Sequence, residues 1–311
     1  MVNKVLILLG PTSVGKTGAS ILPAKELGTE IISADSMQVY RHMDIGTAKP
    51  SREEMALVRH HMIDIVEPWE EFSAGRFIEE VVPIIERLHS EGKVPLVVGG
   101  TGLYIKSMTR GLFSAPGANT ILREELLSEE EEEPGTLYGL LLELDPETAK
   151  GITPNDTRRL IRALEVCLQS ACPVSELKKS LTSPLPYDFI KIGITRERDE
   201  LYSLIERRVD EMIEAGLLEE AKKVLSMNPS RTAMQAIGYK ELAGFLEGEY
   251  PLEEAVRLIK RNTKRYAKRQ FTWFKKEEGI SWADVTGIYE PGDIYLEIKK
   301  KIKGLDTAIF R

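Results

Sequence analysis

Residues 4–17 read Lys4-Val-Leu-Ile-Leu-Leu-Gly-Pro-Thr-Ser-Val-Gly-Lys-Thr17, and this stretch decides the fold. Its first part, after Lys4, is a continuous apolar run of the kind that is buried on both faces of a parallel sheet. Residues 10–17 then match the P-loop pattern G-x-x-x-x-G-K-[ST], and a helix is predicted from Lys16 to Leu27, ended by Gly28. We therefore predict an α/β protein with a phosphate-binding loop after its first strand.

Such a loop is suited to hold a diphosphate group. Its glycines let successive backbone N–H groups turn inward, and the start of the following helix adds partial positive charge. Lys16 supplies a point charge, and the hydroxyl of Thr17 is placed to ligate Mg²⁺. We predict that the whole loop binds a diphosphate or a nucleotide, ATP included: Gly10, Pro11, Thr12, Ser13, Val14, Gly15, Lys16 and Thr17.

Strands and helices continue to alternate after the loop. Glu30–Ala34, Val94–Val98 and Lys191–Thr195 are predicted strands, and Arg76–Glu91 is a predicted helix that stops at Gly92. This alternation predicts a P-loop NTPase-like parallel sheet flanked by helices, with ligand-binding loops at the carboxyl ends of the strands. The later helices are predicted at Arg198–Ala215, Leu217–Leu225, Tyr239–Leu246 and Leu252–Lys276.

The composition changes near Ser114–Gly117, and little strand character follows until about Pro186. We predict an all-helical insertion over residues 116–189, with residues 1–115 and 190–311 forming the P-loop core. The acidic run Glu129–Glu133 is expected to be a solvated loop or helix face. The predicted helices of the insertion are Thr120–Leu127, Pro146–Gly151 and Asp156–Leu168.

Composition favours a cytoplasmic protein without a membrane span. The 311 residues are 42% hydrophobic, but the apolar runs are only strand-length, and no signal peptide precedes the first strand. Cys167 and Cys172 form neither a disulfide framework nor a zinc site. The net charge of −7 argues against a protein that coats nucleic acid generally.

One segment departs from this acidic balance. Nine Lys and Arg residues and no Asp or Glu lie between Arg257 and Lys276, with aromatic residues interleaved. Lys260, Lys264 and Lys268 repeat at helical spacing, beside a parallel row of arginines. A phosphate-rich partner is favoured over a plain solvated face, because such a face normally mixes in glutamates. The aromatic residues could stack on bases or belong to the helix core.

Three further positions attract attention. Asp35 ends the second predicted strand, where it could act as a base or merely cap a turn. Thr101, in the glycine turn after the strand Val94–Val98, could contact substrate or cap the next helix. The pair His60-His61, near Asp64, is more consistent with structural roles than with a metal site, because adjacent side chains diverge.

These segments together resemble the tRNA dimethylallyltransferase (tRNA isopentenyltransferase) family. The strings Ser33-Ala-Asp-Ser-Met-Gln-Val-Tyr40 and Tyr266-Ala-Lys-Arg-Gln270 are far more specific than the P-loop. The other matching stretches are Gly10–Thr17, His60-His-Met-Ile-Asp64, Val98-Gly-Gly-Thr-Gly-Leu-Tyr104, Asp156-Thr-Arg-Arg-Leu-Ile-Arg-Ala-Leu-Glu165, Met234-Gln-Ala-Ile-Gly-Tyr-Lys-Glu241 and Thr263–Trp273. They run in the family's order from about residue 7 to about residue 275.

The resemblance implies transfer of the dimethylallyl group from dimethylallyl diphosphate to N6 of adenosine 37 in tRNA, with release of diphosphate and with Mg²⁺ as cofactor. It implies catalytic roles for Asp35, Lys16, Thr17 and Thr101, of which Thr17 is the metal ligand. The insertion is expected to grip the anticodon stem-loop, and the enzyme to be a monomer. The implied tRNA contacts are Asp35, Ser36, Met37, Gln38, Thr101, Arg123, Arg158, Arg159, Arg162, Gln235, Gly238, Tyr239, Lys240, Lys268, Arg269, Gln270 and Trp273.

Some residues depart from the family pattern. The family often has Thr-Gly where this chain has Ser170-Ala171, and Glu129–Gly135 is short and unusually acidic. No Cys/His cluster follows Cys172, so the zinc finger of some relatives is not expected. Two alternatives remain open from the residues themselves. One is a small-metabolite or nucleoside kinase that uses Asp35 as base, and the other is a nucleotide-gated RNA-binding module.

Overall fold

A computed structural model describes residues 3–113, 115–181 and 183–305 of the chain. The chain divides into two compact units, Met1–Ser107 with Pro186–Arg311, here called the core unit, and Met108–Leu185, the helical unit. The boundaries predicted at residues 115/116 and 189/190 are therefore each shifted toward the amino terminus. At the second boundary the reason is pairing, because Asp188 lies opposite Lys4 in the sheet.

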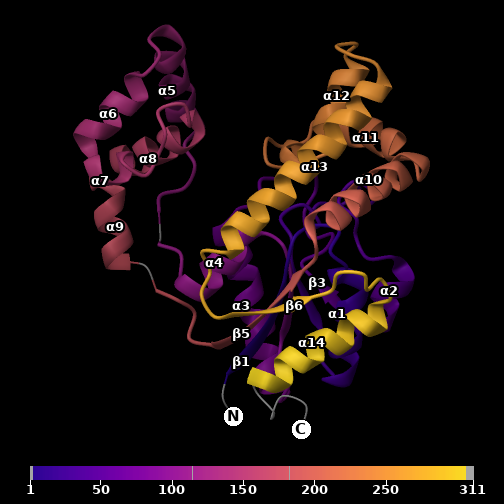
Figure 1. The fold of residues 1–311 in the computed structure, drawn as a ribbon. Coiled ribbons are helices and arrows are strands. Elements are labelled where there is room, and N and C mark those ends of the chain that lie inside the picture. Colours follow the sequence, from indigo (N-terminus) through magenta and orange to yellow (C-terminus); the bar gives the residue numbers. More distant parts are fainter. Residues whose placement is uncertain (1–2, 114, 182, 306–311) are drawn as a thin grey trace. The chain divides into compact units, whose positions relative to one another are not determined.

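The core unit is built on a six-stranded sheet in the order β3-β2-β4-β1-β5-β6 (Figure 1). Every pair of neighbouring strands is parallel, which confirms the predicted sheet. Two short edge strands, β3 and β6, were not expected. The strands are β1 Lys4–Leu9, β2 Ile31–Ala34, β3 His60–His61, β4 Leu96–Gly99, β5 Asp188–Thr195 and β6 Ile280–Asp284.

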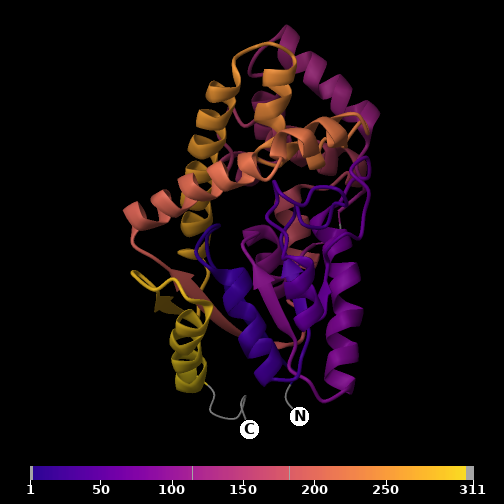
Figure 2. The same ribbon diagram turned by 90° about the vertical axis from the view of Figure 1, so that its right-hand side faces the viewer.

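Helices cover both faces of this sheet. Figure 2 shows α1 and α14 on one side of the strands and α3 on the other. Beyond the carboxyl ends of the strands, α10 to α13 form a further helical layer of the core unit (Figure 1). The helices are α1 Lys16–Glu26, α2 Arg52–Leu57, α3 Ala74–Ser90, α4 Gly102–Arg110, α10 Arg198–Glu214, α11 Leu217–Leu225, the 3₁₀ turn η1 Ala233–Gln235, α12 Tyr239–Leu246, α13 Leu252–Phe274 and α14 Pro291–Leu305.

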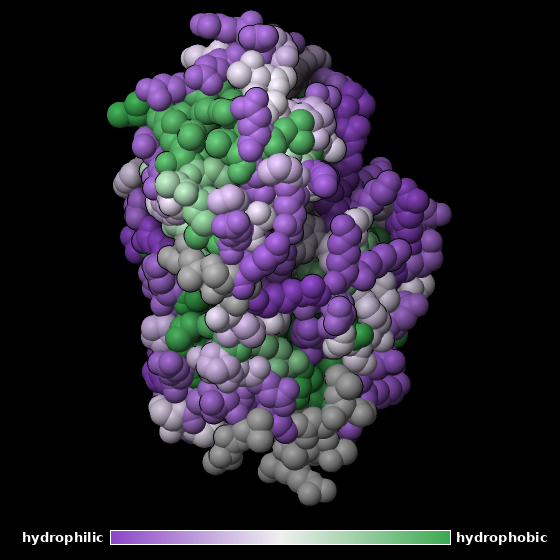
Figure 3. Space-filling view, turned by 90° about the vertical axis from the view of Figure 1, so that its left-hand side faces the viewer, coloured by the Kyte–Doolittle hydropathy of each residue, from purple (hydrophilic) through white to green (hydrophobic). Residues whose placement is uncertain are grey.

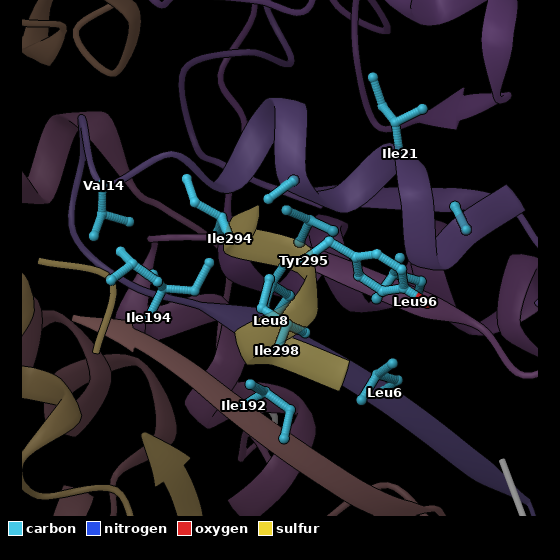
Figure 4. Close-up of a cluster of buried hydrophobic side chains, with 14 of the residues drawn as sticks. Leu6, Leu8, Val14, Ile21, Leu96, Ile192, Ile194, Ile294, Tyr295 and Ile298 are labelled. Carbon is cyan, nitrogen blue, oxygen red and sulfur yellow. The ribbon is translucent and has the colours of Figure 1, made fainter. Parts of the chain in front are cut away.

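The apolar run of β1 is buried as its sequence predicts. Leu6 and Leu8 lie on the face covered by α1 and α14, where they pack among the side chains shown in Figure 4. Val5 and Ile7 point to the opposite face, and all four residues are at most 1% exposed. Because neither face of β1 meets solvent, the end of this strand is a rigid base for the loop that follows it.

Close backbone contact brings three strand ends together. A Cβ on Gly99, at the end of β4, would lie 2.2 Å from the carbonyl oxygen of Ala34 at the end of β2. Only glycine therefore permits this approach. The N–H of Thr101 donates to the same carbonyl at 3.1 Å. The segments after β1, β2 and β4 consequently meet at one edge of the sheet.

The helical unit has its own core. Leu137, Leu141, Leu160 and Leu164 are fully buried between α5, α6 and α8. The ends of the insertion meet, because the N–H of Leu185 donates to the carbonyl of Met108. Two of its helices, α6 and α9, were not expected. The helices after α4 are α5 Thr120–Glu132, α6 Thr136–Leu144, α7 Pro146–Ala149, α8 Thr157–Ser170 and α9 Val174–Leu181.

The surface of the helical unit is mixed in character. The acidic run Glu129–Glu133 ends α5 and is largely solvated, as expected, while Glu130 accepts the N–H groups of Gly135 and Leu137. Apolar side chains also gather on this surface (Figure 3), and Ile121 is 70% exposed. In the part of the chain that the structure describes, no helix is both long and apolar enough to span a lipid bilayer.

Candidate active site

The P-loop forms one wall of a cavity of about 360 Å³ at the carboxyl edge of the sheet. Gly15 has φ 104°, a conformation that glycine adopts without strain, and α1 begins directly after it. Val14 is fully buried beneath the loop and anchors it in the core. The Nζ atom of Lys16 donates to the carbonyls of Gly10 and Pro11 at 2.9 and 2.7 Å. The predicted phosphate cradle is therefore formed and lines a cavity.

Lys16 occupies an unusual electrostatic position. Burial lowers the pKa of its amine to about 7, although the nearby carboxylate of Asp35 acts in the opposite direction. The guanidinium of Arg208 lowers the pKa of Lys16 further. A bound diphosphate would supply the negative charge that these two cations require, so the cavity is electrostatically complementary to such an anion.

The turn after β2 places Asp35 in the same cavity. Its Oδ1 atom accepts the N–H groups of Met37 and Gln38 at 2.9 and 3.4 Å. Thr101 holds the turn from the other side, since its hydroxyl oxygen accepts the N–H of Ser36 at 3.0 Å. The capping role that the sequence left open for Asp35 thus occupies one carboxylate oxygen. Among the described residues, none hydrogen-bonds its Oδ2 atom.

A second cavity adjoins Asp35 and is more apolar. Ser36, Gln235 and Arg269 contribute polar side chains to its lining, and Met37 lines it beside Ser36. Its apolar lining comes from the helical layer above the sheet, namely Ile205, Val209, Met212, Leu217 and Ile259. Asp35 therefore lies where a phosphate cradle and an apolar chamber meet.

Two site residues escaped sequence analysis. Arg208 on α10 lines both cavities, and its Nη1 atom lies 3.5 Å from the hydroxyl of Ser13. Arg208 lies on the same helix face as the buried residues Leu201, Ile205 and Val209. A charged residue on an apolar helix face is the sequence signal that could have identified it. Tyr266 also lines both cavities, and burial raises the pKa of its hydroxyl.

Two predicted tRNA contacts are buried in the core unit. Tyr239 is fully buried, and its hydroxyl donates to Glu220 at 2.7 Å. Gln270 is 5% exposed; its amide donates to the carbonyl of Gly100 and accepts the N–H of Thr12, both at 2.9 Å. Their contact with tRNA stays a prediction, and Gln270 lines the phosphate cavity. Gln270 also ties α13 to the phosphate cradle.

The basic face of α13 is partly neutralised within the core unit. Lys260 pairs with Asp210 at 2.6 Å, and Lys264 pairs with Glu206, both acids being on α10. The segment itself contains no acid, but α10, which is distant in sequence, supplies one to each of these two lysines. The exposed basic side chains of α13 are Arg257, which pairs with Glu254, and Arg261, Arg265, Lys268 and Arg269.

The other predicted RNA contacts have varied surroundings. Trp273 is 38% exposed and packs on Gly102, while Lys240 is exposed. Gly238, with φ 107°, starts α12. In the helical unit Arg123 and Arg162 both pair with the buried Glu165, whereas Arg158 and Arg159 are exposed.

The residues at the cradle are compatible with an ion carried by the diphosphate. Thr17 lines the cavity directly after Lys16. Within residues 3–113, 115–181 and 183–305, no group of three or more His, Cys, Asp or Glu side chains could hold a metal ion. His60 and His61 instead bond to Val58 and Glu30. Mg²⁺ commonly binds through one or two protein ligands and substrate phosphates, which is the arrangement that this site allows.

The sequence profile of the IPP transferase family matches residues 38–277. The chain belongs to the IPP transferase family. It is 55% identical over 297 residues to the tRNA dimethylallyltransferase of Thermodesulfovibrio yellowstonii. The aligned residues cover 93% of this chain and 94% of that relative. This chain is 46% identical over 301 residues to the tRNA dimethylallyltransferase of Thermotoga maritima, with 96% and 98% covered.

Solved structures of the family share this architecture. The full-length tRNA isopentenylpyrophosphate transferase of Bacillus halodurans has a TM-score of 0.71 and 41% identity, with 97% of both chains covered. A eukaryotic dimethylallyltransferase acting on tRNA has a TM-score of 0.83 and 31% identity, covering 98% of this chain and 79% of that one. These findings confirm the resemblance and the fold class, and they give the kinase alternative no support.

Proposed function

We propose that this protein transfers the dimethylallyl group of dimethylallyl diphosphate to N6 of adenosine 37 in tRNA, the position immediately 3′ of the anticodon, and releases diphosphate. Family membership supports the reaction class. The observation that carries the proposal is that Asp35 lies between the phosphate cradle and an apolar chamber. A donor with an anionic and an apolar end matches that pair of cavities.

The cradle serves the leaving group. Residues 12–17, Lys16 among them, and Arg208 line the cavity where the diphosphate would bind. Negative charge grows on the bridging oxygen as the C1–O bond breaks, and donors that strengthen their hydrogen bonds at that moment lower the barrier. A cradle of this kind also binds the phosphates of ATP, so we expect ATP to compete for it without being consumed.

Thr17 is the proposed protein ligand of Mg²⁺, with diphosphate oxygens as the other ligands. The bound ion would neutralise charge on the leaving diphosphate. Binding of Mg²⁺ in this way needs no cluster of acidic side chains, and the described residues contain no group of three or more His, Cys, Asp or Glu that could hold a metal ion.

Asp35 is the proposed base. The adenine N6 amino group is conjugated with its ring and is a poor nucleophile, so a carboxylate that accepts its hydrogen bond assists attack on C1. The new N6–C1 bond replaces the C1–O bond, and the amino proton passes to Asp35. The N–H groups of Met37 and Gln38 orient this carboxylate through its Oδ1 atom.

The target base must leave the anticodon loop to reach this carboxylate, which costs a few kcal/mol. We propose that Arg269, Gln235 and Met37 line its path, because all three border the chamber beside Asp35. Exposed arginines and lysines of each unit would bind tRNA phosphates. We further propose a monomeric enzyme that works in the cytoplasm, the compartment of unmodified tRNA.

One incubation tests this function. Purified protein, labelled dimethylallyl diphosphate, Mg²⁺ and unmodified tRNA are combined, and the tRNA is digested to nucleosides. We expect label in N6-dimethylallyladenosine at position 37 and an equal amount of diphosphate. A tRNA with guanosine at position 37 is the matched control and should stay unlabelled. Consumption of ATP against a small hydroxylated acceptor, with no labelled nucleoside, would instead identify a kinase.

A further inference from the structure

Part of the lining of the phosphate cavity comes from a segment without regular structure, residues 44–50, here called the 44–50 loop. Thr47, Ala48 and Pro50 line the phosphate cavity, and Gly46 lines the apolar chamber together with Thr47 and Ala48. The shape of such a loop depends on the groups that form hydrogen bonds with its backbone. The bonds made by residues 44–46 identify that partner.

A single carboxylate holds the loop. Glu220, on α11, accepts the N–H groups of Asp44, Ile45 and Gly46, each at 2.9 Å. The hydroxyl of Tyr239, at the start of α12, donates to the same carboxylate at 2.7 Å. Four donors on one carboxylate are a strong, charge-assisted arrangement that a neutral amide does not reproduce.

The ring of Tyr239 packs against the backbone of the 44–50 loop at Gly46. A Cβ on Gly46 would lie 2.6 Å from the Cε2 atom of the tyrosine, so the loop backbone rests directly on the ring. Burial and the adjacent Glu220 raise the pKa of Tyr239, which therefore stays a hydrogen-bond donor. The loop is thus held by α11 and α12 together.

The loop in turn supports the Asp35 turn. Its carbonyls at Thr47 and Ala48 accept the side-chain amide of Gln38 at 3.4 and 3.2 Å. The oxygen of the same amide accepts the hydroxyl of Ser33 at 2.9 Å. Gln38 also donates its backbone N–H to Asp35. Glu220 is therefore connected to the proposed base by hydrogen bonds together with the backbone of the 44–50 loop and of Gln38.

We infer that Glu220, held by Tyr239, is a positioning residue for catalysis. It holds the 44–50 loop in place as part of the lining of the phosphate cavity. Through this loop and Gln38 it also fixes the orientation of Asp35. The assignment rests on the proposed function for its kinetic consequence, whereas its effect on the diphosphate cavity is independent of that function. Glu220 itself lines neither of the two cavities.

The test compares Glu220→Gln and Tyr239→Phe with Glu200→Gln. Glu200 is a matched control, since it accepts the N–H of Gly287 and pairs with Arg196, and thus anchors a different loop. The assays are kcat per active site, KM for dimethylallyl diphosphate, Kd for tRNA, Kd for inorganic diphosphate with Mg²⁺, and melting temperature. Kinetics are run well below the melting temperature of every variant.

We expect Glu220→Gln to lower kcat/KM for the donor at least tenfold and to weaken inorganic diphosphate binding, with Kd for tRNA within twofold of wild type. Tyr239→Phe should act in the same direction but less, because it removes one donor of four. Glu200→Gln should lower only the melting temperature.

Two results would overturn the assignment. One is a Glu220→Gln enzyme with wild-type kcat/KM and diphosphate affinity, and the other is an equal kinetic loss in Glu200→Gln. If Glu220→Gln does not fold, an unchanged Tyr239→Phe enzyme overturns it instead. Should wild type fail to modify tRNA, the proposed function fails, and inorganic diphosphate binding alone decides the role of Glu220.

Discussion

Asp35 shows how one side chain can serve structure and chemistry together. Its Oδ1 atom caps its own turn, while its Oδ2 atom has no hydrogen-bond partner among the described residues. Replacing the carboxylate by an amide keeps the shape of the side chain but removes the base. We expect Asp35→Asn to lower kcat by about 10²- to 10⁴-fold. Kinetics with tRNA and labelled donor measure this loss.

The same variant should bind tRNA with unchanged affinity, because one half-buried carboxylate adds little to a contact dominated by phosphates. Asp188→Asn is a suitable control, since this exposed acid begins β5 at the opposite end of the sheet. Turnover of Asp35→Asn near the wild-type rate would show that Asp35 is not the base.

Lys16 predicts a particular pH dependence. Its pKa is lowered to about 7 in the free protein, so the amine is largely neutral above that pH. A bound diphosphate favours the ammonium form, so binding above pH 7 takes up a proton. Affinity for diphosphate should therefore fall as pH rises from 7 to 9, by up to about tenfold per unit.

Calorimetry in buffers of different ionisation heat measures that proton uptake directly. Lys16→Met is the comparison, because titration of the diphosphate itself is common to both proteins. We expect about one more proton to be taken up by wild type at pH 8.5. Equal uptake by the two proteins would contradict this assignment.

Ala171 ends α8 in the left-handed region, with φ 49°. This is the position where the family often has glycine, and an L-residue is strained there. We expect Ala171→Gly to raise stability by about 0.5–1 kcal/mol, measured as a higher denaturation midpoint. Ala215 ends α10 with φ −73°, so Ala215→Gly should lower stability by a similar amount. Equal effects of the two substitutions would refute the strain argument.

Different sides of the helix α13 have different roles. Its inward side supplies Tyr266 and Gln270 to the cavity and cradle, and Lys260 and Lys264 pair with α10. The sequence showed the charge of this helix but not its partners, because those acids lie on another helix some fifty residues earlier. Exposed cations near the end of α13 are therefore the ones left for RNA.

Lys268→Ala with Arg269→Ala should weaken tRNA binding and reduce its salt dependence by about one unit in log Kd against log salt for each lost phosphate contact. Lys260→Ala with Lys264→Ala is the matched control, because those lysines already have acidic partners. We expect its salt slope to stay close to that of wild type. An unchanged slope in the first double variant would show that this end of α13 does not meet RNA.

Element boundaries show which patterns are readable in a single sequence. β1 was recognised in the sequence because its five buried residues after Lys4 leave a continuous apolar signal. β6 was missed because it is a partly exposed edge strand with a mixed sequence. The spacing of Ile294, Ile298 and Ile302 is a helical signal for α14 that was overlooked.

At the level of the whole molecule, the sheet class and the phosphate cradle could be predicted because their signals are local. The roles of Glu220 and Gln270 could not be predicted, since they depend on how distant helices pack over the sheet. Arg208 left only one local signal, its charge on the apolar stripe of α10. Motif strings indicated that Tyr239 and Gln270 matter. They did not reveal which way the side chains point.

The two ends of the helical unit, where it joins the core unit, lie next to each other. Leu185 bonds to Met108, and the unit has a hydrophobic core of its own. Replacing residues 116–181 by a short Gly/Ser linker should therefore leave the sheet folded and its binding of inorganic diphosphate unchanged. Binding of tRNA should be greatly weakened, which a filter-binding titration measures. Loss of diphosphate binding in a folded protein would show that the insertion shapes the cradle.

The inward amide of Gln270 has a further consequence for how this protein can vary. Arg269 is exposed, whereas the next residue joins the phosphate cradle to the turn after β4. Each residue turns an α-helix by 100°, so adding or deleting one residue upstream in α13 would swing both side chains out of place. Point changes along the outer side of this helix leave the position of Gln270 unaltered, whereas the rotational phase of the helix, and hence its length before Gln270, is under constraint.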